Sequence, residues 1–361
     1  MKNAANSTDS IIFHTDRVSR ATCHKAGGAF HVSNPARPGT EIKMQNAPQS
    51  HIVRIAASGF PPNRNSKGNN MAICKVVHID AFSDTPGMGN PAGVVLGADH
   101  LRGLDMQAIA KAVGFNETVF VCRSRHADYR FRFFTPGHEM NLCGHATVAA
   151  MWNLNRTASE SSRLWVETAA GILPVWYDRD GNLVRMRQSS PEFVEFSGSR
   201  DALAAALGIK AGGFDPELPI VYGSTGTWTL LVPVRDEEAL FAMRPDNAAF
   251  PSILAKMPRA SVHPFVVTKR DGDMEFSARH FSSPYSGTIE DPVTGTASGV
   301  MGAYAMRHLC PERDEAHFLV HQGKSVGRNG RVFVDVEKTP TETQIFIAGQ
   351  AVPVKEFSVS F

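Results

Sequence analysis

Glu117 is the residue of this sequence whose surroundings best suit proton transfer. It lies in the stretch 114–120, which reads GFNETVF, between a glycine that can end a helix and a run with several apolar residues. Burial at the edge of an apolar cleft disfavours a charged carboxylate and raises its pKa toward the range useful in general acid–base catalysis. A glutamate on a surface turn can have the same local sequence, so the surroundings alone leave both interpretations open.

Two stretches far apart in the chain follow the same order of features. The first is 133–151 (FFTPGHEMNLCGHATVAAM), and the second is 281–301 (FSSPYSGTIEDPVTGTASGVM). Each leads from a strand through a proline turn and an acidic residue to a glycine that opens a helix, Gly144 in one and Gly295 in the other. Both predicted helices are apolar or small on almost every face, which is typical of a helix enclosed by other structure. We therefore expect two sheets, each curled around one central helix.

The starts of these two helices could together bind an anion. Free N–H groups and the positive dipole end at a helix N-terminus attract negative charge, and a glycine there lets a ligand approach the backbone. If the starts at Gly144 and Gly295 face one cleft, they form a pocket for a carboxylate. The alternative is that both glycines serve only close packing.

Three side chains beside these glycines are candidates for chemistry. We expect His145 in the first helical turn, where the positive helix end would lower its pKa and leave a neutral imidazole that donates a hydrogen bond to a substrate. A buried histidine bonded to backbone is the alternative. Asp291 is expected to cap the second helix, to bind substrate, or to do both. Cys143 could be a thiolate base, because a helix N-terminus lowers a thiol pKa, whereas its counterpart Thr294 is a poor base.

No metal ion is expected at this site. His138, Glu139, Cys143 and His145 are of metal-ligating types, but their spacing fits no zinc pattern, and a helix N-terminus repels cations. Proton transfer by a carboxylate needs no organic cofactor either. We therefore predict a site that works without a cofactor.

The elements that must hold these residues are mostly strands. From Met71 onward the sequence alternates with period two between glycine and proline turns, and it predicts strands at 127–135, 163–168, 171–177, 227–234, 264–268, 274–281, 331–336 and 344–348. Two further helices are predicted at 105–113 and 199–207, each ended by a left-handed glycine. The fold class is α+β, dominated by strands.

Length and composition limit the kind of protein. A chain of 361 residues exceeds the size at which one core stops growing, so two globular units are expected. Five scattered cysteines, no apolar run long enough for a membrane span and no secretory signal favour a cytoplasmic protein. Residues 1–70 hold nine of the 37 basic residues and three of the 35 acidic ones, so the remainder is mildly acidic and nucleic-acid binding has little support.

Residues 1–70 differ from the rest of the chain. They are rich in Asn, Ser, Pro, Gly and Ala and show no sustained periodicity, a composition typical of disorder. A clear strand pattern begins directly after Met71. We predict that 1–70 is a disordered or non-native extension and that Met71 is the natural start. The alternative is a basic, acid-poor targeting peptide.

Several motifs follow one another along the chain. They are IDAF at 79–82, GNPAGV at 89–94, NETVF at 116–120, FTP at 134–136, GH at 144–145, EDPVTG at 290–295, QG at 322–323 and GR at 327–328. These motifs and their order resemble the PhzF family of phenazine-biosynthesis isomerases. The resemblance, over roughly 73–360, implies a diaminopimelate-epimerase-like fold with two pseudo-symmetric domains, each a rolled β-sheet around a central helix. The domains would be 71–188, with a last strand at about 355–361, and 189–354. An active site between them and a homodimer are also implied.

The same resemblance implies roles for individual residues. In the phenazine enzyme a glutamate moves a proton on a dihydro-hydroxyanthranilate ring, and that glutamate corresponds to Glu117. The family's histidine and aspartate fall on His145 and Asp291. Its serine falls on Thr296, whose extra methyl group favours a different substrate. The residues expected to contact substrate are Asn90, Cys143, Gly144, Gly295 and Thr296.

Together these features predict a PhzF-like isomerase that moves a proton on a small carboxylate-bearing substrate, either amino-acid-like or a cyclic hydroxy acid, through Glu117. Because Thr294 replaces the second thiol of the related epimerases, we do not expect a symmetric two-thiol mechanism. Two alternatives stay open. One is an amino-acid epimerase or racemase that uses Cys143 as its base, and the other is a non-catalytic binding member of the family. The expected partner is the small-molecule substrate, with neither nucleic acid nor a membrane.

Overall fold

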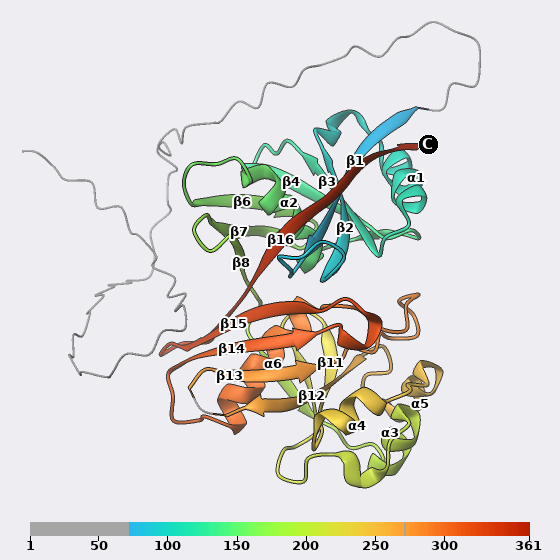
Figure 1. Ribbon diagram of the computed structural model, residues 1–361, viewed down its shortest axis with the longest axis vertical. Helices are drawn as coiled ribbons and strands as arrows, with labels where there is room; N and C mark the ends of the chain where they lie inside the picture. The colour runs from blue at the N-terminus through green and yellow to red at the C-terminus, as the bar shows by residue number, and fades with distance from the viewer. Residues whose placement is uncertain (1–71, 271) are drawn as a thin grey trace, which may run out of the picture. The chain divides into compact units, whose positions relative to one another are not determined.

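A computed structural model of the protein describes residues 72–270 and 272–361 (Figure 1). The predictions for residues 1–70 and for Met71 lie outside the described residues. The first half contains β1 (Ile73–Ala81), β2 (Asn90–Leu96), α1 (Gly103–Val113), β3 (Glu117–Cys122), β4 (Tyr129–Phe134), β5 (Glu139–Met140), α2 (Gly144–Asn155), β6 (Ser162–Thr168), β7 (Gly171–Asp178) and β8 (Leu183–Arg187). The second half contains β9 (Glu192–Glu195), α3 (Arg200–Leu207), β10 (Val221–Ser224), β11 (Trp228–Pro233), α4 (Glu237–Ala242), α5 (Phe250–Ile253), β12 (Ser261–Lys269), β13 (Met274–Ala278), α6 (Gly295–His308), β14 (Glu315–Gln322), β15 (Gly330–Lys338) and β16 (Thr343–Ser360).

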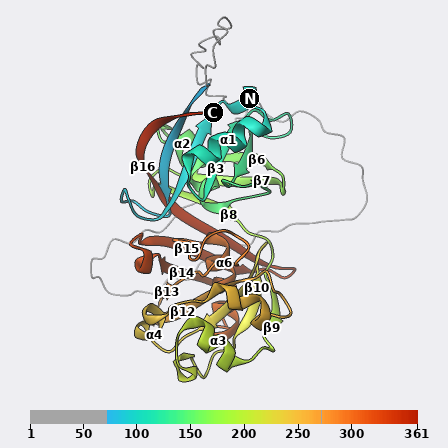
Figure 2. The same cartoon turned by 90° about the vertical axis from the view of Figure 1, so that its right-hand side faces the viewer.

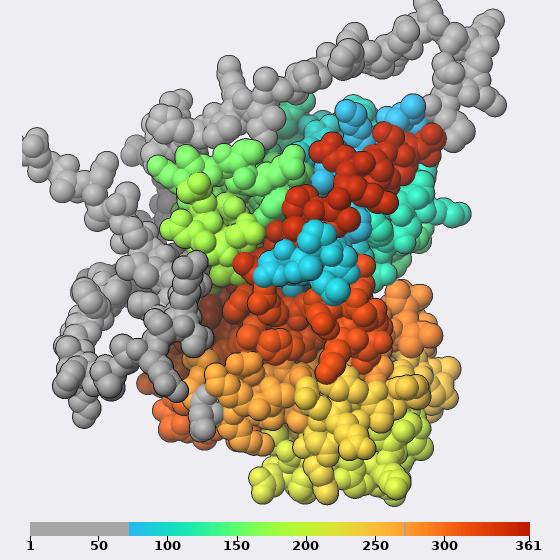
Figure 3. All heavy atoms as spheres, viewed as in Figure 1, coloured from blue at the N-terminus to red at the C-terminus, as the bar shows by residue number. Residues whose placement is uncertain are grey.

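One path of paired strands runs through both halves. Its order is β1-β2-β3-β4-β6-β7-β8-β16-β15-β14-β13-β12-β11-β10-β9, and β16 also pairs with β1. Residues 343–350 of β16 pair with β15 and β8, and 351–360 pair with β1, which closes the strands of the first half into a ring. Figures 1 and 2 show β16, in red, passing from the second group of strands to the first, and Figure 3 shows it at the surface. The predicted domain boundary at 188 stays a prediction, because the halves share this strand.

Each half encloses one apolar helix. α2 contacts β1, β2, β3, β7, β8 and β16, and ten of its twelve residues are buried. α6 contacts β10, β14, β15 and β16, with eleven of fourteen residues buried. Glycine allows this close packing, since a Cβ at Gly302 would lie 2.6 Å from the Val334 side chain. The predicted central helices that begin at Gly144 and Gly295 are confirmed, and strands curl around each, but these strands belong to one continuous sheet rather than to two separate sheets.

The outer elements mostly follow their local sequence. α1 and α3 end at left-handed glycines, and the Ser199 hydroxyl accepts a hydrogen bond from the N–H of Ala202 at the start of α3. The predicted strand 274–281 is shortened to β13, because Phe281 forms isolated bridges with Val262 and Glu290. The pattern does not predict α4 and α5, which at six and four residues are too short to show a helical period. In 72–270 and 272–361 no helix is long and apolar enough to cross a membrane.

A buried ion pair joins the halves close to the start of β2. Asp80, at the end of β1, is fully buried, and its Oδ1 accepts a hydrogen bond from Nη2 of Arg328 (2.6 Å). The same oxygen lies 3.0 Å from His78 Nε2, while Oδ2 accepts from the N–H of Gly87 (2.7 Å). Arg328 also donates to the carbonyl of Gly89 (2.9 Å). This cluster therefore holds the loop between β1 and β2 against the second half.

Replacing Arg328 with methionine should lower the free energy of unfolding by about 3–5 kcal/mol, because it leaves the buried Asp80 charge without its main partner. The matched control is Arg102→Met, which removes an exposed ion pair with Asp105 and should change stability little. Urea denaturation of the two variants measures the difference. Equal losses of unfolding free energy in the two variants would show that the Asp80–Arg328 pair does not hold the two halves together.

Candidate active site

One cavity of about 700 Å³ has the starts of both enclosed helices in its wall. Residues of both halves line it. Those predicted from the sequence are Glu117, Cys143, Gly144 and His145 from the first half, and Asp291, Gly295 and Thr296 from the second. The condition set in the sequence analysis, that both helix starts face one cleft, is thus met. Of the eight residues predicted for the site, Asn90 is the one that does not line the cavity.

The helix starts leave backbone N–H groups without a partner in their own helix. The first bonds along the helices run from the N–H of Thr147 to the carbonyl of Cys143 and from the N–H of Ser298 to the carbonyl of Thr294, each 3.0 Å long. The N–H groups of the residues in between have no carbonyl available in their helix. A negatively charged group in the cavity would therefore be stabilised by both helix dipoles.

The two glycines at these starts lack a side chain for different reasons. A Cβ at Gly295 would lie 2.5 Å from Ile347 Cδ1 and 3.1 Å from Phe82 Cζ, so packing requires glycine there. A Cβ at Gly144 would meet only Ile347 Cδ1, at 4.0 Å. The alternative that both glycines serve close packing therefore holds for Gly295 but not for Gly144. The missing side chain of Gly144 leaves room in the cavity.

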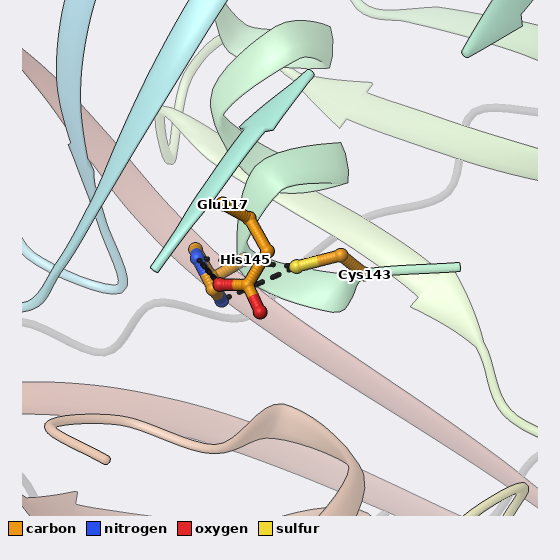
Figure 4. A group of neighbouring side chains, drawn as sticks. All are labelled: Glu117, Cys143 and His145. Atoms are coloured by element: carbon orange, nitrogen blue, oxygen red, sulfur yellow. Dashed lines mark hydrogen bonds and ion pairs between the residues drawn. The ribbon is translucent and has the colours of Figure 1, made fainter. Parts of the chain in front are cut away.

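Glu117, Cys143 and His145 point toward one another (Figure 4). Glu117 is the first residue of β3, Cys143 immediately precedes α2, and His145 is in the first turn of α2. His145 Nε2 lies 3.2 Å from Glu117 Oε2, and its Nδ1 lies 3.5 Å from Cys143 Sγ. The side chains of Glu117 and His145 are 15% and 9% exposed, so water screens their interaction little.

The pKa of His145 moves opposite to the sequence-based expectation. Burial alone lowers it, but the Cys143 sulfur and the Glu117 carboxylate outweigh burial and hold the pKa well above its usual range. The expected direction of the pKa shift, a lowering by the helix start, is therefore wrong. The lowering effect of the positive helix end on the pKa of His145 is opposed by the carboxylate of Glu117 in β3. Only the folded chain brings this carboxylate next to His145.

The expectation of a lowered thiol pKa at Cys143 is also wrong. Burial and the negative charge of Glu117 raise it, although His145 acts in the opposite direction. Cys143 is 7% exposed, so desolvation of a thiolate outweighs the pull of the helix start.

Asp291 is held by residues of both halves. Its Oδ1 accepts a hydrogen bond from Asn90 Nδ2 (2.9 Å), and its Oδ2 accepts from the Thr294 hydroxyl (2.5 Å). Burial raises the pKa of Asp291, whereas the charge of His145 and these two hydrogen bonds oppose the rise. Asp291 does not cap α6, because Thr294 occupies the N-cap position. Asn90 is fully buried and does not line the cavity, but its hydrogen bond holds the Asp291 side chain in place.

The donor atoms of Glu117, Cys143 and His145 all lie within 4.8 Å of one another, close enough to hold a metal ion. This set differs from the one weighed in the sequence, since Glu139 forms an ion pair with Arg132 (2.7 Å) and His138 bonds Thr135. Burial raises the pKa of the Cys143 thiol, and a thiol must lose its proton to bind a metal. A site without a metal therefore stays our prediction.

Sequence reasoning missed most of the second-half residues that line the cavity. They include Trp228, Arg259, His280, Ser282, Ser283 and Tyr285. Most lie on loops or strand ends whose position depends on the pairing of distant strands. His280 carried a signal, because this titratable residue directly precedes the second of the two matched stretches.

Comparisons with known proteins agree with this arrangement. A family described as phenazine biosynthesis-like protein (PhzC-PhzF) matches residues 79–357. The chain is 47% identical over 286 residues to the uncharacterized isomerase YfhB of Bacillus subtilis, covering 78% of this chain and 97% of that protein. It is 33% identical over 268 residues to the trans-2,3-dihydro-3-hydroxyanthranilate isomerase of Pseudomonas aeruginosa, covering 73% and 90%. The crystal structure of a Bacillus anthracis phenazine biosynthesis protein of the PhzF family matches with a TM-score of 0.77 and 48% identity, covering 81% of this chain and 100% of that one.

The chain belongs to the PhzF family and has its diaminopimelate-epimerase-like α+β fold, as predicted. Its relatives are named isomerases, and members of this family act without a cofactor, so the protein is a cofactor-independent isomerase. The alternative of a non-catalytic binding protein is thereby overturned.

The two helix-start glycines should respond differently to alanine. Gly295→Ala should lower the free energy of unfolding by about 1–3 kcal/mol, because the new methyl group overlaps Ile347 and Phe82. Gly144→Ala should change stability by less than about 1 kcal/mol, since the site is open. Urea denaturation compares them. Equal destabilisation would contradict the distinction between a packed and an open helix start.

Glu117→Gln should lower the pKa of His145, because it removes one of the groups that raise it. An NMR titration of the ring C2 proton measures the midpoint. In the wild type the raised pKa means that the folded state binds this proton more tightly than the unfolded chain. The resulting stabilisation is fully present below about pH 6.5 and is lost as the pH rises through the folded value. An unchanged midpoint in the variant would show that Glu117 does not act on His145.

Proposed function

We propose that the protein isomerises a small carboxylate-bearing substrate by removing and returning one proton through Glu117. The observation that carries this proposal is that Glu117, His145 and Asp291 share one cavity with two helix starts. An anion site next to a general base is what proton transfer on a carboxylate-bearing molecule requires.

The substrate carboxylate binds at the starts of α2 and α6. The N–H groups there have no partner in their own helices, and both dipoles favour an anion. The open space beside Gly144 lets the carboxylate reach the backbone. The rest of the substrate then lies in the part of the cavity lined by Glu117 and Asp291.

Glu117 acts as the base and then as the acid. A substrate C–H bond breaks, the proton passes to a Glu117 oxygen, and the electron pair stays on the substrate. Glu117 returns the proton to a different carbon, so the reaction consumes no co-reactant. His145, whose pKa is raised by Cys143 and Glu117 despite burial, donates a hydrogen bond to the oxygen on which negative charge develops. Asp291 and Thr296 hydrogen-bond the other polar groups of the substrate.

An amino-acid epimerase or racemase with Cys143 as its base is the second candidate. The observation in its favour is the 3.5 Å contact between Cys143 Sγ and His145 Nδ1, since a protonated imidazole stabilises a thiolate. Burial acts against it by raising the pKa of Cys143. At the matching position the Thr294 hydroxyl donates to Asp291, so a second base of that kind is missing.

Two substrate classes follow from these features. The P. aeruginosa relative is named for a cyclic hydroxy-carboxylate substrate, which makes cyclic hydroxy acids the first class to test. Amino-acid-like carboxylates are the second, because the two helix starts would bind the carboxylate of either class. A homodimer and a cytoplasmic location stay predictions from the sequence.

A deuterium wash-in experiment tests the role of Glu117. The protein is incubated in heavy water with members of both substrate classes, and incorporated deuterium is measured by NMR. Glu117→Gln keeps the shape but removes the base, so exchange should slow by at least about a hundredfold. The matched control Glu160→Gln changes an exposed glutamate and should exchange at the wild-type rate.

If Glu117→Gln incorporated deuterium into the substrate at nearly the wild-type rate, Glu117 would not be the base. If Cys143→Ala were inactive at the same time, the racemase would replace the isomerase as the better account. Activity in Cys143→Ala together with inactivity in Glu117→Gln would support the single-base mechanism.

A further inference from the structure

A pair of histidines that the proposed mechanism does not use borders the same cavity. His263 in β12 is fully buried, and His280, just after β13, is 8% exposed and lines the cavity. Their Nδ1 atoms lie 3.2 Å apart. The carbonyl of His280 accepts a hydrogen bond from the N–H of Asp291 (3.0 Å), so the pair is attached directly to a residue of the site.

The contact between the two Nδ1 atoms constrains the protons on both rings. A hydrogen bond needs one donor and one acceptor, so one ring has its proton on Nδ1 and the other ring accepts there. Burial lowers the pKa of both histidines, that of His280 to about 4, so both rings are neutral near pH 7. Each ring therefore carries a single proton.

The far nitrogen of His263 indicates which ring is the donor. Its Nε2 is buried without a hydrogen-bond partner among the described residues. For backbone groups a buried N–H without an acceptor is rarer than an under-satisfied acceptor, and we apply the same preference to the ring, which assigns the proton of His263 to Nδ1. From there it donates to Nδ1 of His280. His280 must then carry its own proton on Nε2, the nitrogen that the pair does not use.

We propose that His280 contacts the substrate by donating its Nε2–H to a substrate oxygen, and that His263 is the positioning residue that sets this tautomer. The inference rests on the proposed function only in treating the cavity as a substrate site. A ring N–H pairs with a hydroxyl, carbonyl or carboxylate oxygen and cannot pair with an ammonium group. At the His280 end of the cavity the site therefore favours a second oxygen function over an amino group. Hydroxy acids meet this requirement.

Nitrogen-15 NMR of histidine-labelled protein tests the tautomer without any substrate. Long-range correlations between ring protons and ring nitrogens distinguish the two neutral forms, and the His280→Asn variant identifies the His280 signals. We expect His280 to have a protonated Nε2 and a bare Nδ1 from about pH 6 to 8. A proton on His280 Nδ1 would overturn the proposal.

Variants of His263 separate positioning from general structure. His263→Phe removes the donor and should leave His280 as a mixture of tautomers. His263→Asn places an amide N–H near the position of the lost Nδ1 and should restore the Nε2–H form. The control His317→Asn changes an exposed histidine paired with Asp335 and should leave the His280 signals unchanged. If the Phe variant does not fold, the wild-type and Asn spectra still decide the tautomer.

Adding a ligand to the wild-type protein tests the contact itself. Millimolar 3-hydroxybenzoate, which has a second oxygen function, should shift the His280 Nε2 signal more than benzoate, which lacks it. Equal shifts, or no shift with either probe, would show that His280 does not donate a hydrogen bond to a substrate oxygen. These readouts do not depend on exchange activity. A failed wash-in experiment would therefore count against Glu117 as the base and leave the tautomer of His280 standing.

Discussion

The site depends on two hydrogen bonds that cross from one half of the protein to the other. The buried side chain of Asn90, at the start of β2, donates to Asp291 Oδ1 and to the carbonyl of Val293, each at 2.9 Å. β2 pairs in parallel with β3, whose first residue is Glu117. One amide therefore links the strand next to the base with the segment that leads into α6. A buried amide N–H that loses its acceptor costs free energy. The two hydrogen bonds of Asn90 therefore hold the two walls of the cavity in a fixed relative position.

The neighbours of two histidines in one cavity shift the pKa values of the two rings in opposite directions. His145 lies next to the Glu117 carboxylate and the Cys143 sulfur, which raise its pKa despite burial. His280 faces another histidine, and burial lowers its pKa to about 4. The cavity thus combines one proposed donor beside Glu117, His145, with a second proposed donor, His280, whose carbonyl accepts a hydrogen bond from the N–H of Asp291. Both donors suit a substrate that carries several oxygen atoms.

The two halves repeat a fold but do not repeat its chemistry. Each supplies a helix start to the cavity, yet Gly295 is closed by Ile347 and Phe82, whereas Gly144 is open. The first half supplies the proposed base, and the second supplies Asp291 and the histidine pair. At the matched positions the first half has the Cys143 thiol, and the second has the Thr294 hydroxyl, which donates a hydrogen bond to Asp291. This asymmetry favours one proton carrier over a pair of equivalent bases.

The amino-acid sequence by itself determined the two enclosed helices, their glycine starts and the residues beside them. Those features are local, since burial on every face and a glycine at a helix start are visible in a single stretch. Only the tertiary structure decided the protonation of His145 and Cys143, the support of Asp291 by Asn90, and the presence of the His263–His280 pair. Each depends on distances between residues far apart in the chain. Such distances arise from strand pairing, and local patterns do not encode them.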